Sequence, residues 1–566
     1  MSESAPARLQ AARALLDAGA VGRAIAALRE TIAEFPELAD AQALLGEALE
    51  ASGDRVGAET ALRAALAIQP DCLAAAVRLA GLLTPRRRAA EAVAILGPLA
   101  DHPSADVKLL TALGLALKTV GRQDDAVDAY RRAAELAPAD AAAQHNLAGA
   151  LGDAHRFADS LAATRRAFEL DSDVPETWLV RGRSLFGLGE YDDAERAFGE
   201  AIARHPTYAD AHAELAQLKW MRTEDVAAAV EEIDRALALA PGDAQLSLAK
   251  ARVLEYAGEA EAAYDTLAAP LKTQPGHLAL QVGAAQLMLS LDADLAITHA
   301  QKAYDMAPDS GPAASMLCQA DLALGRADAA ARLAEGLMRD WPLDQHPVTL
   351  AATAWRIMDD PRYPALYDYD RLVVRRSIDT PAGWPTLGAY LEDLAASLRA
   401  LHRMRAHPIG QSLRHGVQTG GSLTRSDDPA IKAFFAAIDP IIRSYIARLG
   451  ERDDVLGRRV TAGYRFSGAW SALLRPGGHH VDHIHPLGWI SSAFHVELPE
   501  AIEDGHQGWL KFGQPGLVTT PILGPERFEK PRAGDLVLFP SYMWHGTVPF
   551  GGEKPRLAIA FDVVPA

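Results

Sequence analysis

The chain has 566 residues, 49% of them hydrophobic, and a formal net charge of −18. This length exceeds one ordinary domain, and the acidic balance argues against nucleic acid as a partner because phosphate binding needs basic clusters; a neutral or basic polypeptide fits better. The two cysteines, Cys72 and Cys318, give no disulfide framework, and no signal peptide or membrane-spanning apolar run is evident. We therefore expect a cytoplasmic protein with no membrane partner.

Proline recurs through residues 1–343 at a spacing of 33 to 35 residues, apart from one doubled interval. The prolines are Pro36, Pro70, Pro103, Pro138, Pro206, Pro241, Pro275, Pro308 and Pro342. Small and large residues recur with them, and the repeat that begins at 175 contains Trp178, Gly182, Ala194, Phe198, Ala201 and Pro206. Such a period is typical of stacked helix–turn–helix units and resembles the tetratricopeptide repeat. We expect about ten repeats in residues 1–343, forming an all-α superhelix whose groove binds a protein or peptide.

Beyond the repeats the composition changes in two stages. Residues 344–405 lose the repeat period but keep helical spacing of apolar positions, which predicts a helical bridge. In residues 406–566 glycine, proline and β-formers increase, which predicts a mainly β domain with flanking helices. We expect strands over 460–466, 469–474, 489–498 and 536–539, and a helix over 429–449.

A histidine-rich segment lies within the predicted β domain. It reads Gly477-Gly478-His479-His480-Val481-Asp482-His483-Ile484-His485-Pro486, and a distant His545 and then Arg556 follow it. On a regular strand residues i and i+2 share a face, so His483 and His485 would point into one cavity, and His480 and Asp482 would share the opposite face. A His-x-Asp pair with a distant histidine is the usual facial triad for non-haem Fe(II), so both pairs stay open as metal ligands.

The order of these motifs carries a family resemblance. A glycine turn precedes His483-Ile484-His485-Pro486, a strand starts at Ile490-Ser491, and the run from Leu536 to Pro540 comes before His545. Residues 406–566 resemble the 2-oxoglutarate/Fe(II)-dependent oxygenases of the prolyl 4-hydroxylase-like superfamily, in particular a group often fused to tetratricopeptide repeats.

The resemblance implies a double-stranded β-helix, or jelly-roll, domain with flanking helices. Its catalytic metal ligands would be His483, His485 and His545, and they would hold Fe(II). Arg556 would bind the distal carboxylate of the cosubstrate 2-oxoglutarate, and molecular oxygen would take the remaining metal position.

Two residues depart from the pattern of that group. His485 stands where most members have Asp, so three neutral imidazoles would leave the metal its full charge and could favour zinc, manganese or copper. Ala558 stands where Ser is frequent.

Our first hypothesis is an Fe(II)- and 2-oxoglutarate-dependent dioxygenase that hydroxylates a side chain of a protein or peptide recruited by the repeats. The departures keep open a repeat scaffold with an inactive or metal-sensing barrel, and a third hypothesis is a small-molecule hydroxylase in which the repeats mediate assembly.

Overall fold

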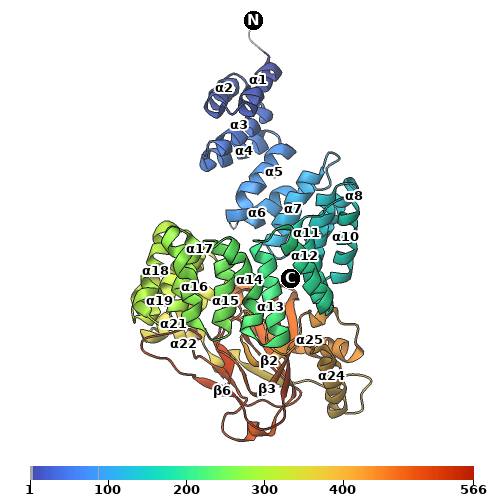
Figure 1. The fold of residues 1–566 in the computed structure, drawn as a ribbon, viewed down its shortest axis with the longest axis vertical. Helices are drawn as coiled ribbons and strands as arrows, with labels where there is room; N and C mark the ends of the chain where they lie inside the picture. The colour runs from blue at the N-terminus through green and yellow to red at the C-terminus, as the bar shows by residue number, and fades with distance from the viewer. Residues whose placement is uncertain (1–3, 87) are drawn as a thin grey trace. The chain divides into compact units, whose positions relative to one another are not determined.

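The computed structural model describes residues 4–86 and 88–566 (Figure 1). The chain divides into two compact units between Ala197 and Phe198. The described part of the first unit is helical, whereas the second unit combines helices with two β-sheets. The domain boundaries predicted at residues 343 and 405 fall within the second unit and stay predictions.

The first unit is built from short helices that pack in consecutive pairs. They are α1 (Ala5–Asp17), α2 (Val21–Glu34), α3 (Ala39–Ala51), α4 (Arg55–Ile68), α5 (Leu73–Leu83), α6 (Ala89–Leu96), α7 (Val107–Thr119), α8 (Gln123–Leu136), α9 (Ala141–Asp153), α10 (Phe157–Glu169) and α11 (Pro175–Leu188); the division of the chain falls within α12 (Tyr191–Arg204). Small residues allow the close packing within a pair, since a Cβ added at Gly114 would lie 2.7 Å from the Tyr130 ring. These are the small and large positions of the sequence period, and the helical-repeat fold is confirmed.

The second unit continues with helices of the same kind and then changes character. The repeat helices are α13 (Ala209–Thr223), α14 (Val226–Leu239), α15 (Ala244–Tyr256), α16 (Ala260–Thr273), α17 (Leu278–Met288), α18 (Ala293–Met306), α19 (Gly311–Ala323) and α20 (Ala327–Asp340). The later helices are α21 (Gln345–Ile357), α22 (Arg362–Leu366), α23 (Tyr369–Leu372), α24 (Leu387–Leu401) and α25 (Pro429–Leu449). Helix α25 has the predicted bounds because the Asp428 carboxylate accepts the amides of Ala430 and Ile431 at its start.

Two antiparallel sheets follow, as in a β-sandwich. The strands are β1 (Val374–Ser377), β2 (Leu413–Gln418), β3 (Tyr464–His480), β4 (Ile490–Glu497), β5 (Leu510–Phe512), β6 (Arg527–Glu529), β7 (Asp535–Pro540), β8 (His545–Thr547) and β9 (Arg556–Pro565). The larger sheet has the order β1-β7-β4-β9-β3-β2, and the smaller has the order β6-β5-β8. The predicted antiparallel β domain is therefore present.

Two details of the predicted elements were wrong. The bridge predicted as helical also supplies strand β1, which pairs with β7 from Val374↔Leu538 to Ser377↔Asp535. The two strands predicted over 460–466 and 469–474 are one strand, β3, because a register shift between Phe466 and Gly468 absorbs the irregularity without ending its pairing with β9.

The last repeats and the sheets share one hydrophobic core. A single cluster of buried residues extends from Cys318 of α19 to Val564 of β9. Direct hydrogen bonds join the same parts: Trp220 Nε1 of α13 donates to the His407 carbonyl (3.0 Å), and Thr349 Oγ1 of α21 donates to the Tyr542 carbonyl (2.7 Å). Within the described ranges, no helix has both the length and the apolar character to cross a bilayer.

Candidate metal centre and cosubstrate pocket

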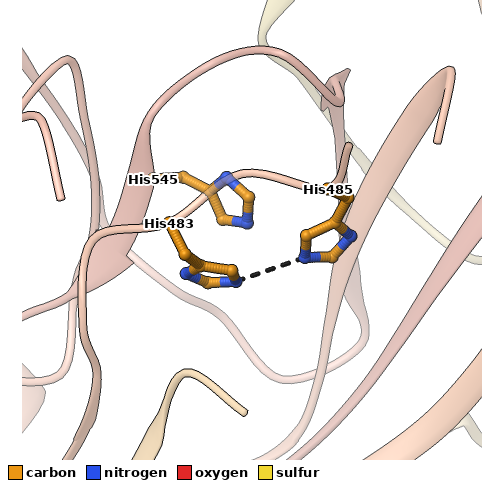
Figure 2. Close-up of side chains that lie close together, drawn as sticks. All are labelled: His483, His485 and His545. Atoms are coloured by element: carbon orange, nitrogen blue, oxygen red, sulfur yellow. Dashed lines mark hydrogen bonds between the residues drawn. The ribbon is translucent and has the colours of Figure 1, made fainter. Parts of the chain in front are cut away.

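The structure brings His483, His485 and His545 together, although they come from separate segments. His545 begins β8, and its backbone exchanges two hydrogen bonds with His483 (2.9 and 3.0 Å). The His485 amide donates to the Ser541 carbonyl at 3.0 Å. One ring nitrogen from each histidine lies within 4.8 Å of the others, which is a spacing that one metal ion could bridge (Figure 2). Within the residues that the structure describes, this is the one such group of His, Cys, Asp or Glu.

Hydrogen bonds at Nδ1 leave the Nε2 atoms for a ligand. His483 Nδ1 donates to the Val481 carbonyl (2.8 Å) and His545 Nδ1 to the Met543 carbonyl (2.9 Å). A carbonyl only accepts, so both rings carry their proton on Nδ1, as metal-binding histidines usually do. The Nε2 atoms of His483 and His485 then face each other at 3.2 Å (Figure 2). Imidazole nitrogens that converge in this way can ligate a cation, so the residues fit a bound metal ion.

Burial keeps these rings in the form that binds metals. Burial, with His545 and His485 as neighbours, holds the pKa of His483 well below its ordinary value. Burial, with His485 nearby, does the same to the pKa of His545. Both rings are therefore neutral at pH 7, and metal ligation needs the neutral imidazole.

Asp562 is a residue that sequence reasoning missed. Its carboxylate lies 2.6 and 2.7 Å from His485 Nδ1 and also accepts from Ser491 Oγ (2.6 Å). Asp562 and Arg556 are six positions apart on β9 and both line the cavity, as the alternation of a strand predicts. A carboxylate is thus present behind His485, where it can offset the charge of a metal. The available signal was an acid within the apolar run from Ile559 to Val564.

The strand geometry assumed for the histidine segment was wrong. Strand β3 ends at His480, and residues 481–489 form a loop with a one-residue bridge at His483. The alternative pair, His480 and Asp482, lies outside the three-histidine group. His480 Nδ1 lies 3.0 Å from Ser412 Oγ, and the Asp482 carboxylate pairs with Lys511 (2.8 Å). Loop geometry rather than strand alternation therefore brings His483 and His485 to one point.

Arg556 lies at the buried end of the same cavity. The residue is 3% exposed, and burial lowers the pKa of its guanidinium to about 10, so it stays charged at pH 7. Among the described residues, its Nε and Nη1 have no hydrogen-bond partner, and Nη2 meets only His495 Nδ1, at 3.4 Å. A buried cation with unpaired donors is costly unless an anion completes it. The residues present thus fit the carboxylate of a cosubstrate such as 2-oxoglutarate.

One cavity of about 600 Å³ contains both features. The three histidines and Arg556 line it, and Trp470, Phe539 and Ile559 contribute apolar walls. Ala558 also lines it and offers no donor beside Arg556. A metal-binding cluster and an unpaired arginine in one apolar cavity can hold a metal chelated by an anionic small molecule.

The fold and this site define a class of protein: helical repeats followed by an antiparallel β domain with a three-histidine group at its cavity. The family described as "Putative 2OG-Fe(II) oxygenase" matches residues 468–562. Tetratricopeptide-repeat families match residues 9–71, 179–244 and 107–140. The chain therefore combines tetratricopeptide repeats with a C-terminal region that matches the family described as "Putative 2OG-Fe(II) oxygenase".

Individual relatives match parts of the chain. The Hsp70-Hsp90 organizing protein of Triticum aestivum is 32% identical over 108 residues, which are 19% of this chain and 19% of that protein, so the chain matches about a fifth of that relative's length. Among solved structures, yeast Tom70 is 16% identical with a TM-score of 0.32, covering 65% of this chain and 99% of that chain. Pseudomonas aeruginosa pilF is 17% identical with a TM-score of 0.33, covering 37% and 94%. A tetratricopeptide repeat protein from Parabacteroides merdae is 16% identical with a TM-score of 0.36, covering 44% and 98%.

Proposed function

We propose that the chain is an Fe(II)- and 2-oxoglutarate-dependent dioxygenase that hydroxylates a side chain of a protein or peptide recruited by its repeats. The observation that carries the proposal is the shared cavity, which is lined by three histidines with one ring nitrogen each in a close group and by Arg556 with its unpaired donors. The family match over residues 468–562 supports the same reaction class.

The proposed metal ligands are His483, His485 and His545. Bound Fe(II) and 2-oxoglutarate together would supply the activation of molecular oxygen, and the protein would supply position and surroundings. Carbonyl acceptors at two Nδ1 atoms and the Asp562 carboxylate at the third fix the planes of the rings. Fixed rings keep the three nitrogens close without reorganisation when the metal binds.

Arg556 is the proposed anchor of the cosubstrate. Its planar fork of donors matches a carboxylate, and that carboxylate would satisfy the Nε and Nη1 groups that lack partners. The apolar walls of Trp470 and Phe539 would exclude water and strengthen this ion pair.

The test is an anaerobic titration of the full-length apo protein with Fe(II) and 2-oxoglutarate, which follows the visible charge-transfer band of the chelate. We expect a band that disappears in His483→Ala and His545→Ala. It should persist in His480→Ala, which separates the two candidate ligand pairs, and in the control His506→Ala, whose exposed ring stacks on Phe528. Absence of the band in wild-type protein that still binds a divalent metal would refute the proposal.

The second candidate is a repeat scaffold whose β domain senses metal without turnover. The all-imidazole ligand set and Ala558 favour it, because neither is the commoner residue for this chemistry. It predicts that His545→Ala loses metal while partner binding and cellular hydroxylation products stay unchanged. A small-molecule hydroxylase differs from these two candidates in its substrate. The full-length protein would then hydroxylate a small molecule when no polypeptide substrate is present.

A further inference from the structure

A second arginine, Arg414, lines the same cavity at the end where the repeats meet the β domain. Its Nη1 donates to the carbonyls of Gln411 (2.8 Å) and Leu413 (3.0 Å). A guanidinium has five N–H donors, so the edge formed by Nε and Nη2 stays available. Within the described residues, no carboxylate forms an ion pair with Arg414. The available edge is the side-on fork that binds a carboxylate through two parallel hydrogen bonds.

A repeat helix holds Arg414 in place. The guanidinium carbon lies 5.3 Å from the ring centroid of Tyr256, the last residue of α15, and Tyr256 itself lines the cavity. This cation–π contact holds the guanidinium beside the ring without using its donors. Burial lowers the pKa of Arg414, and the nearby Tyr256 and Glu255 only partly oppose this shift, so the cation is partly desolvated. The Glu255 carboxylate accepts a hydrogen bond from Gln286 Nε2 (2.9 Å). Its charge raises the pKa of Arg414.

The backbone around Arg414 is irregular in a way that orients this side chain. The register between β2 and β3 shifts between Arg414 and Gly416, and His415 there has a φ of +51°. Glycine is required next, since a Cβ at Gly416 would lie 2.6 Å from the Leu473 carbonyl oxygen. Bulges of this kind redirect side chains beside active sites.

The position of Arg414 is close to the metal histidines. Ser412 Oγ lies 3.2 Å from His483 Nε2, and Arg414 is two residues further along the chain, roughly 7 Å in extended backbone. A substrate carboxylate bound by Arg414 would therefore lie a few covalent bonds, along the same substrate, from the carbon that faces the metal. Arg556, on β9, is a separate anion site at the buried end of the cavity.

We propose that Arg414, in cation–π contact with Tyr256, binds a carboxylate of the substrate, so that the hydroxylated polypeptide presents an Asp or Glu side chain or its chain terminus beside the target residue. This inference rests on the proposed function for the reaction but concerns binding, which can be measured without turnover. It also gives one repeat helix a direct part in selecting the substrate.

The experiment measures which peptides the full-length protein retains under anaerobic conditions with Fe(II) and 2-oxoglutarate. The probes are decapeptide libraries in matched forms: internal Asp/Glu against Asn/Gln, and C-terminal acid against C-terminal amide. We expect wild-type protein to prefer one carboxylate form by about 10- to 100-fold, the usual value of a charge-assisted hydrogen bond. Which matched pair shows the preference identifies the source of the carboxylate. Arg414→Gln should abolish the preference, and Arg414→Lys should restore only part of it because lysine lacks the fork.

Controls separate this inference from folding and from the proposed function. Arg465→Gln removes an exposed arginine on β3 and should leave the preference intact. Tyr256→Phe should keep most of it, whereas Tyr256→Leu should weaken it. Equal retention of both forms, or a preference that survives Arg414→Gln, would overturn the inference. Loss of the cosubstrate band in Arg414→Gln would overturn it too, by assigning Arg414 to 2-oxoglutarate. A missing band in wild-type protein would refute the proposed function, and the peptide comparison would still decide on Arg414.

Discussion

The repeat region and the C-terminal region encode their structures in different ways. Residues 1–343 contain 50 acidic and 32 basic residues, whereas residues 344–566 contain 24 of each and 11 of the 18 histidines. The repeats specify structure by a local period, since each unit packs against its neighbours. The site instead needs β2, the loop after β3, β8 and β9 to meet. Local packing and long-range assembly should therefore respond differently to substitution.

The largest expected effect is on the affinity for the cosubstrate 2-oxoglutarate. Arg556→Met should weaken 2-oxoglutarate binding by up to about 100-fold, because it removes a charge-assisted fork, and should leave Fe(II) affinity nearly unchanged. The apo protein should not be destabilised, because the substitution removes a buried charge without partners. Anaerobic calorimetry measures the binding and thermal unfolding the stability, with Arg465→Met as the surface control. Unchanged 2-oxoglutarate affinity would contradict the assignment.

The next effect tests the carboxylate behind the metal site. Asp562→Asn keeps the shape and an acceptor for His485 Nδ1 but removes the charge, so Fe(II) affinity should fall by about 10-fold or more. Ser491→Ala, which removes only a neutral donor to the same carboxylate, should have a smaller effect. Competition with a chelating dye gives both affinities. Equal binding by Asp562→Asn and wild type would show that the charge of Asp562 plays no part.

A smaller effect should be confined to the first unit. In Gly114→Ala the new methyl group would meet the Tyr130 ring at 2.7 Å, so the free energy of unfolding of that unit should fall by about 1–3 kcal/mol. Gly149→Ala in α9 of the same unit is a matched control, since a Cβ there meets nothing within 4 Å. Fe(II) and 2-oxoglutarate affinities should stay at wild-type values in both variants. A change in metal affinity would break the distinction between local repeats and an assembled site.

The smallest effect concerns pH at the contact between α13 and the β domain. Burial, aided by Arg414, His415 and Arg475, lowers the pKa of His407 to about 4. Its folded form stays neutral while the unfolded form takes a proton near its ordinary pKa of about 6.5. Stability contributed by the neutral ring is therefore present above pH 6.5 and lost as pH falls toward 4, by about 1 kcal/mol near pH 5.5. Denaturant unfolding should show a shallower acid loss in His407→Gln than in the control His506→Gln.

The sequence predicted the two kinds of region unequally well. The proline period and the recurring small residues predicted helical repeats because the determinants lie within one repeat length. Helix α25 was predicted to the residue because its capping aspartate and apolar spacing are local. Strand β1 was missed because its four residues become a strand only by pairing with β7, which lies far along the chain.

The candidate site was predictable in its histidines and Arg556 and not in its supporting residues. Asp562 reaches His485 through the pairing of β4 with β9, and no local pattern marks that contact. Arg414 and Tyr256 meet only because a repeat helix packs beside β2, so neither residue type signals the contact in sequence. Tertiary packing therefore sets the surroundings of the ligands that the motif names.

The last repeats and the sheets share one core, so the local opening of either part is coupled to ligand binding in the cavity. A ligand that binds only the closed state stabilises every segment that must open with the site, by about 2.7 kcal/mol at a concentration 100 times Kd. Since one buried cluster joins α19 to α21 with β4, β7 and β9, loading the cavity should slow amide hydrogen exchange in α19 to α21 as well as in the strands. Helices with no residue in the cavity would then report its occupancy.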